Sequence, residues 1–197
     1  MIAHEQQYHK KEKHGMTQWN IDPAHSEIAF KVKHMVISTV TGQFRQFKGT
    51  IEVNDSDFND ARMRFEANID SISTNNEQRD AHLKSPDFFD VANHPQLTFV
   101  SKSFARNSST EFELIGDMTI RGITKEIKLD VVFNGIVKGF DGDIAAFEIT
   151  GKLNRQDFGL RWNALTEAGG FAVGDEVKLS IVVELKKAGV EELAVAV

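Results

Sequence analysis

Hydrophobic and polar residues alternate with a period of two along most of the chain after Trp19. In the clearest segment, 177–185, every second residue is Val, Leu or Ile, and Lys178, Ser180 and Glu184 stand between them. Such alternation gives one apolar face and one polar face, which is typical of a half-buried strand. The same pattern predicts eight strands, near residues 28–32, 44–53, 63–69, 97–104, 112–120, 127–133, 145–153 and 177–185.

Eight such strands are too many for a small open sheet with one solvated face, so the pattern predicts an all-β closed barrel or sandwich. The connections at Asn107–Ser109, Arg121–Gly122 and Asp141–Asp143 are short and polar. They leave no room for crossover helices, which favours antiparallel neighbours in a mostly up-and-down order.

Two segments, 73–95 and 154–175, interrupt the alternation. In the first, Thr74 and Glu77 are spaced as a capping box, which predicts a short helix, and Ser85 before Pro86 predicts a second short turn. The second segment contains four glycines, a density suited to tight turns or to a flap beside the last strand.

Arg79, Asp80 and His82 fall within four residues of the predicted helix and raise the question of an active site. Residues two positions apart on a helix point to different sides, so Asp80 and His82 cannot form an acid and base dyad there. We expect an exposed pair of Asp80 with Lys84 instead. We also expect Leu83, Phe88 and Phe89 to be buried against one end of the sheet.

A metal site built from His82, Asp90 and His94 is conceivable, but its spacing matches no zinc motif, and we expect no metal. No glycine-rich phosphate loop, dinucleotide fingerprint or nucleophile elbow is present, and no cofactor is expected. The absence of cysteine excludes disulfides and thiolate chemistry.

The net charge of -6 disfavours nucleic-acid binding, which needs a basic face. No run approaches the roughly 18 apolar residues of a membrane-spanning helix. The first fifteen residues are polar and resemble no signal peptide, so we expect a cytoplasmic protein. The expected organisation is a disordered extension over 1–15, one domain over 16–188 and a flexible tail over 189–197. A homodimer through an exposed strand or the helical segment is compatible with the pattern, which does not require it.

The chain has 15 phenylalanines and one tyrosine, which predicts an interior almost without hydroxyl groups. An eight-stranded barrel can be filled by such side chains or can hold one small ligand, and alternation alone does not separate the two. His34 continues the face of Phe30 and Val32, where a histidine either packs in the core or meets a polar head group.

Four separated blocks resemble the YceI-like family, in the order and at the distances found there. They are Trp19–Ser26; Gln78–Ser85 with Phe88–Val91 and His94–Pro95; Gly116–Lys125; and Asn154–Leu160. The resemblance runs from about residue 19 to 185. It implies a lipocalin-like, eight-stranded antiparallel barrel with a short helical segment in the long loop after the third strand.

The resemblance also implies that the barrel binds a long apolar chain, typically a polyisoprenoid or another amphiphilic lipid, and no established catalytic activity comes with it. Many bacterial relatives carry an export signal and act in the periplasm, from which the N-terminus of this sequence departs. Motif residues such as Arg79, Asp80, His82, Arg155 and Asp157 could hold the long loops in place.

The alternating faces give candidate wall residues, and the two irregular segments give candidates that could cap or gate the cavity. The wall candidates are Ile28, Phe30, Val32, Met63, Phe65, Phe99, Phe112, Leu114, Leu129, Val131, Phe147 and Ile149, with His34 as a contact for a head group. The capping candidates are Phe88, Phe89, Phe158 and Trp162.

Three hypotheses follow for the function. The first is noncatalytic binding, transport or sequestration of a polyisoprenoid, quinone-like or fatty-acyl molecule. The second is a lipid-modifying enzyme that uses His34, His82 or His94 as a base. The third is a structural or interaction module with a fully packed barrel.

Overall fold

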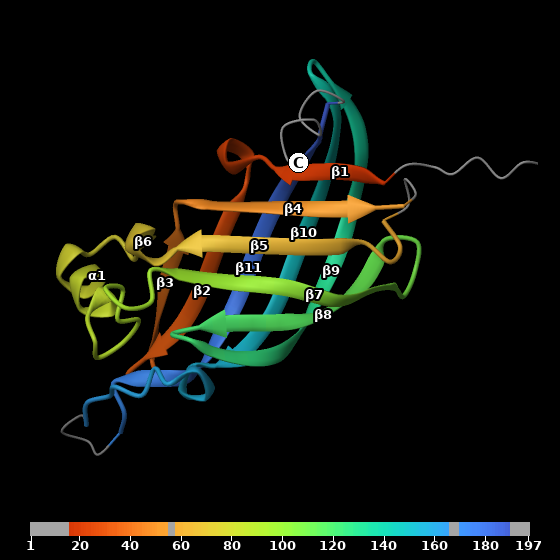
Figure 1. Cartoon of the computed structure of the whole chain (residues 1–197). Coiled ribbons are helices and arrows are strands. Elements are labelled where there is room, and N and C mark those ends of the chain that lie inside the picture. Colours follow the sequence, from red (N-terminus) through yellow and green to blue (C-terminus); the bar gives the residue numbers. More distant parts are fainter. Residues whose placement is uncertain (1–15, 55–57, 166–169, 190–197) are drawn as a thin grey trace, which may run out of the picture.

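The computed structural model describes residues 16–54, 58–165 and 170–189 as an antiparallel β-barrel with one short α-helix at one end (Figure 1). The expected extension over 1–15 and all but residue 189 of the expected C-terminal tail lie outside the described residues, so both stay predictions, as does the cytoplasmic location. Within the described part of the chain, no helix is long and apolar enough to cross a membrane.

The barrel consists of eight long strands, three of which are each interrupted once. The interrupted strands are β1 (Thr17–Ile21) with β2 (Glu27–His34), β3 (Ser38–Phe44) with β4 (Phe47–Val53), and β5 (Arg62–Asn68) with β6 (Ile72–Ser73). The continuous strands are β7 (Gln96–Arg106), β8 (Glu111–Ile120), β9 (Ile123–Gly139), β10 (Gly142–Asn154) and β11 (Val173–Lys187). The predicted eight-stranded antiparallel barrel is therefore confirmed.

The ring closes at β11, which pairs with β10 on one edge and with both β1 and β2 on the other. Ile181 lies opposite Ile28 of β2, and Lys187 lies opposite Trp19 of β1. β1 and β2 therefore act as two halves of one strand along the edge of β11. From β7 to β11 each strand pairs with the next in sequence, so the predicted up-and-down order holds there.

The helix α1 (Glu77–Lys84) follows β6, hence the third long strand, as expected. Its N-cap differs from the prediction, because the Asn76 side chain, not Thr74, accepts a hydrogen bond from the Arg79 backbone N–H, at 2.9 Å. The predicted Asp80–Lys84 pair is also wrong. Lys84 Nζ lies 3.1 Å from the Asp70 carboxylate, and Asp80 accepts a hydrogen bond from Thr74. Each of the two charged side chains is thus paired with a residue before the helix and not with the other.

The two ends of the barrel are closed by different means. At the end where β1 begins and β11 finishes, Phe58 is 1% exposed and its ring lies 5.3 Å from Trp19 and 5.1 Å from Phe147. Phe104 and Phe112 stack at 4.6 Å in the same core cluster. This end is therefore plugged by aromatic rings. The other end carries α1, the turns around residues 85–95 and the short helix η3 (Arg155–Phe158) (Figure 1).

The bend between β1 and β2 is stabilised by Asp22, whose side chain is 8% exposed. Its carboxylate lies 2.8 Å from Lys186 Nζ and 2.7 Å from His25 Nδ1, and its backbone N–H donates to the Glu184 carbonyl. The hydrogen bond from Lys186, followed by that from His25, lowers the pKa of Asp22 from 3.8 to about 2. The ionised carboxylate thus fastens the bend to β11, where the barrel closes.

We expect acid to weaken the fold through Asp22. Its pKa is lower in the folded chain than in the unfolded chain, so its contribution is fully present above about pH 4 and is lost as the pH falls toward about 2. The contribution is at most about 2 kcal/mol and is reduced by solvent screening, because Lys186 is half exposed. Urea unfolding at several pH values, compared between the wild type and Asp22→Asn, measures it.

The matched control is Asp70→Asn, which removes an exposed carboxylate whose partner is Lys84. This variant should retain the wild-type dependence of stability on pH, with a change in the free energy of unfolding below about 1 kcal/mol. An Asp22→Asn protein whose stability still falls between about pH 4 and about pH 2 as steeply as that of the wild type would contradict the assignment.

Candidate ligand-binding cavity

The interior of the barrel is hollow. A cavity of about 590 Å³ extends along the inward faces of the strands, and most of the residues that line it are apolar. This volume lies within the range of about 300–1,000 Å³ that is typical of ligand-binding pockets. Because inward side chains alternate with outward ones along each strand, the wall presents almost only hydrocarbon.

Of the seventeen residues that the sequence analysis selected for ligand contact, fifteen line this cavity, although their part in binding remains a prediction. They are Ile28, Phe30, Val32, His34, Met63, Phe65, Phe88, Phe89, Phe99, Leu114, Leu129, Val131, Phe147, Ile149 and Trp162. Period-two alternation therefore placed the inward faces of six strands in the correct register.

The other two selected residues do not line the cavity. Phe112 is 1% exposed and stacks on Phe104, which does line it, and the Arg106 guanidinium lies 4.5 Å from the centre of the Phe112 ring. Phe158 is equally buried but belongs to η3, outside the wall. Both therefore pack behind the surface that a ligand would touch.

Several lining residues were not selected from the sequence. Leu179, Ile181 and Leu185 of β11 continue the wall, and their alternation was visible in the sequence. Phe58 and Leu160 lie outside the strands, and no local pattern distinguishes them from other loop residues.

A glycine opposite an aromatic ring helps to keep the lumen open. The Phe30 ring lies so close to Gly42 of the neighbouring strand that a Cβ atom there would be 2.3 Å from Phe30 Cζ. Phe99 covers Gly116 in the same way, at 2.4 Å. Because the tip of each ring occupies the space that a side chain on the neighbouring strand would fill, the rings take up less of the interior.

The polar lining residues gather where α1, the end of β2 and the start of β11 meet, with Arg64 of β5 as the exception. They are Lys33, His34, Thr74, Asn76, Gln78, Arg79, His82 and Arg155. The charged residues of the lining are lysine or arginine, and it includes no aspartate or glutamate, although the whole chain carries a net charge of -6. This end of the cavity is therefore its polar mouth.

Asp80 and Arg79 hold the start of α1 against β6 at this mouth. Asp80 accepts hydrogen bonds from the backbone and the hydroxyl of Thr74, which is 5% exposed, and Arg79 donates to the Thr74 hydroxyl at 2.7 Å and carbonyl at 2.8 Å. Both motif residues therefore bind Thr74, and these hydrogen bonds connect the helix to the strand before it. The expectation that they support the long loops agrees with this geometry.

The three histidines proposed as possible bases are not gathered at one place. His34 and His82 line the cavity, whereas His94 lies beside Gly122 and does not. His82 Nε2 lies 3.0 Å from Asp87, and its ring meets that of Trp162 edge to face at 4.7 Å. His82 and Phe88 thus help to position the Trp162 ring at the mouth.

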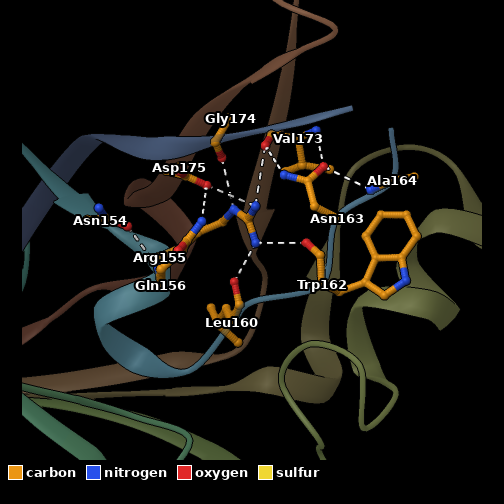
Figure 2. Close-up of polar contacts among 10 residues, drawn as sticks. All are labelled: Asn154, Arg155, Gln156, Leu160, Trp162, Asn163, Ala164, Val173, Gly174 and Asp175. Atoms are coloured by element: carbon orange, nitrogen blue, oxygen red, sulfur yellow. Dashed lines mark hydrogen bonds and ion pairs between the residues drawn. The ribbon is translucent and has the colours of Figure 1, made fainter. Parts of the chain in front are cut away.

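Arg155 fixes the segment that carries Trp162 (Figure 2). Its side chain is 3% exposed, and its guanidinium donates to the carbonyls of Leu160, Trp162, Val173 and Gly174 and to the carboxylate of Asp175. The bonds to Trp162 and Gly174 are 2.9 Å long. Burial lowers the pKa of Arg155 from its ordinary value, while Asp175 opposes this effect.

Asn163 completes this attachment. Its side chain donates to the Val173 carbonyl at 2.8 Å and accepts from the Val173 N–H at 3.0 Å. The Asn163 amide thus makes the two hydrogen bonds that the backbone of a neighbouring strand would make. Gly159, with φ of 76°, ends η3 and turns the chain into this loop. The glycine-rich segment predicted as tight turns or a flap is therefore pinned to β11 at its described residues.

Among the described residues, the group whose side chains approach one another closely enough to hold a metal is Asp22, His25 and Glu184. It lies at the bend between β1 and β2, and the Lys186 ammonium already lies 2.8 Å from the Asp22 carboxylate. His82, Asp90 and His94 do not form such a group.

Replacement of Arg155 should loosen the mouth. Arg155→Met would leave the carbonyls of Leu160, Trp162 and Gly174 without the guanidinium donor, while Val173 keeps Asn163 and Asp175 keeps Gln156. We expect a loss of at least about 3 kcal/mol in the free energy of unfolding. Arg155→Lys should recover only part of it, since an ammonium cannot reproduce the planar fork. Asp175→Asn, at a site 46% exposed, should cost about 1 kcal/mol or less.

Acrylamide quenching of tryptophan emission separates a local effect from a global one. The chain has two tryptophans, and Trp19 is 2% exposed inside the plugged end. Quenching should rise in folded Arg155→Lys, because Trp162 is released. Unchanged quenching together with unchanged stability would contradict the role given to Arg155.

Comparison with known proteins agrees with this architecture. The model of the YceI-like domain matches residues 19–185. A UPF0312 protein of Staphylococcus aureus (strain MSSA476) is 40% identical over 165 residues, which cover 83% of this chain and 94% of that protein, and the one of strain MW2 gives the same values.

Solved structures show the same fold. The YCEI protein of Campylobacter jejuni is 31% identical with a TM-score of 0.67, covering 85% of this chain and 96% of that one. BcnA of Burkholderia cenocepacia is 19% identical with a TM-score of 0.71, covering 83% and 98%. A polyisoprenoid binding domain from Saccharophagus degradans, implicated in plant cell wall breakdown, is 13% identical with a TM-score of 0.60, covering 86% and 98%. By the family match and the identity to its relatives, the chain belongs to the YceI-like family.

Proposed function

We propose that the protein binds one long-chain apolar lipid inside the barrel and carries or sequesters it without chemical change. The ligand class is a polyisoprenoid, quinone-like or fatty-acyl molecule. The observation that carries this proposal is the cavity of about 590 Å³, walled by hydrocarbon and polar at one end. A molecule with a long apolar chain and a small polar head matches both parts.

The energetics support such a ligand. Burial of about ten methylene groups at ~0.8 kcal/mol each gives ~8 kcal/mol gross, from which the cost of ordering the chain is subtracted. A prenyl chain of several isoprene units contains more carbon than this. Chain length therefore provides the affinity, while the polar groups of the mouth provide selectivity for the head.

The comparisons support the same ligand class. The Saccharophagus degradans domain is described as polyisoprenoid binding, and it shares this fold at 13% identity. At that identity the likeness concerns the fold, so the ligand is carried over to this chain as part of the proposal.

A lipid-modifying enzyme is the alternative from another class. It would use His34 or His82, which line the cavity. The carrier predicts that a bound lipid is recovered unaltered, whereas the enzyme predicts turnover that stops when both histidines are replaced by glutamine. The third hypothesis, a fully packed barrel, is disfavoured by the cavity.

Native mass spectrometry tests the proposal directly. Protein purified from its own host without detergent should carry a stoichiometric excess mass that organic extraction recovers as one prenyl or acyl lipid. A bare polypeptide mass that persists after incubation with geranylgeraniol would overturn the proposal.

The length of the bound chain should depend on Gly42. Gly42→Ala adds a methyl group where Phe30 now lies, so the ring has to move into the lumen and shorten it. We expect the affinity for geranylgeraniol to fall roughly tenfold, while that for geraniol changes little. Titration of delipidated protein with both prenols measures the difference.

Thr41→Val is the matched control. Thr41 is exposed and adjacent to Gly42 on β3, so the substitution places an additional methyl group on the outer face of the barrel. Both prenol affinities should match those of the wild type. If Gly42→Ala lost affinity for geraniol and for geranylgeraniol equally, the length of the lumen would not determine which chain length binds.

A further inference from the structure

Apolar side chains are exposed around the mouth of the cavity, on two segments distant in sequence. Met35, Val36 and Ile37 form the turn between β2 and β3, and Leu165 and Phe171 lie in the loop before β11. Their exposed fractions range from 47% for Met35 to 87% for Ile37. Large apolar groups gathered on one surface are uncommon on a soluble domain and mark interaction sites.

Backbone hydrogen bonds hold the two segments together. The Met35 N–H donates to the Ala172 carbonyl at 2.9 Å, His34 pairs with Val173, and Leu165 forms a bridge with Phe171. Both segments continue the cavity wall, since His34, Ala172 and Val173 line the cavity. The exposed surface is therefore the outward extension of the interior.

The turn keeps its apolar residues against the preference of the backbone. Met35 and Val36 have φ of 49° and 67°, a left-handed conformation that is unfavourable for a β-branched residue and that asparagine and glycine adopt easily. Two residues at such a turn are normally small or polar. Stability of the hairpin does not explain this choice of Met and Val.

The charges beside this surface are basic. Lys31, Lys33 and Arg161 are exposed and make no ion pair with any described residue. The carboxylates at the start of β11 are already paired, Asp175 with Arg155 and Glu176 with Lys152 and Lys178. The β9–β10 turn at the opposite end, at the top of Figure 1, also exposes apolar side chains, namely Val137 and Phe140. There, however, Lys138 is accompanied by Asp141 and Asp143. Exposed apolar residues combined with net positive charge thus occur at the cavity mouth.

We propose that Met35, Val36, Ile37, Leu165 and Phe171 dock the protein on the surface of an anionic lipid bilayer, with Lys33 and Arg161 facing the head groups. The inference rests on the proposed function for the nature of the cargo. A long-chain lipid is nearly insoluble in water, and a mouth pressed against the bilayer lets it enter the cavity without crossing water. The helix α1 with Glu77, and the turn after it with Asp87, would remain in solvent.

Co-sedimentation with vesicles tests the docking surface. The full-length protein should bind vesicles of phosphatidylcholine and phosphatidylglycerol in equal parts more strongly than vesicles of phosphatidylcholine alone. Replacement of Lys33 and Arg161 by glutamine should weaken binding to the mixed vesicles by about fivefold per charge and should leave phosphatidylcholine binding unchanged.

The decisive variant combines Met35→Asn with Val36→Gly, a pair that the left-handed turn favours. It should unfold at the same temperature as the wild type or a higher one, so misfolding cannot explain a loss of binding. The partition onto both vesicle types should fall at least tenfold, and geranylgeraniol binding in solution should be unchanged. The matched control, Val137→Ser with Phe140→Ser, should partition like the wild type.

Three results would overturn the inference: no sedimentation of the wild type, wild-type partition of the Asn-Gly variant, or an equal loss in the control. A concentration-dependent dimer that the Asn-Gly variant abolishes, without vesicle binding, would also overturn it and assign the surface to a second copy of this chain. Vesicle binding by a wild type that fails to bind geranylgeraniol would support the docking surface and overturn the proposed function.

Discussion

The closure of the ring at β11 is the constraint on which the rest of the structure depends. β11 has hydrogen-bonded partners on both edges, with β10 on one and β2 followed by β1 on the other. Along β11 the sheet has no free edge, so the backbone hydrogen bonds are made there without burying polar side chains. The interior can therefore be lined with hydrocarbon. The bend at Asp22 makes closure possible, because it brings both halves of the first long strand alongside β11.

A closed ring leaves two ends to be covered, and the chain covers them in opposite ways. Phe58 and its aromatic neighbours fill one end by packing. At the other end the covering loops are held by polar groups, Arg79 and Asp80 on Thr74 and Arg155 on the loop carbonyls. Hydrogen bonds to a few fixed acceptors can hold a loop in place without filling the volume behind it. This difference explains why the cavity opens toward α1 and η3 and ends at Phe58.

The alternation of residues was sufficient to predict a closed barrel or sandwich and most of the wall, because a period of two follows from backbone geometry alone. The resemblance to the YceI-like family then favoured the barrel. Features that depend on distant partners were missed. The sequence near Asp80 favoured Lys84 as its partner, whereas the fold brings Thr74 to Asp80 and Asp70 to Lys84. Phe112 alternates correctly but lies behind Phe104. Position along the barrel axis depends on strand stagger, which no local pattern records.

Whether the interior would be filled or hollow was likewise undecided by composition. Fifteen phenylalanines could have packed it. The hollow arises where rings such as Phe30 lie over a glycine of the next strand, a pairing that joins residues twelve positions apart and appears only with the register of β2 and β3. A hollow interior forgoes dispersion contacts and therefore costs stability. A ligand that fills it restores those contacts, so binding and folding are linked: a lipid that occupies the lumen stabilises the same barrel that protects it from water.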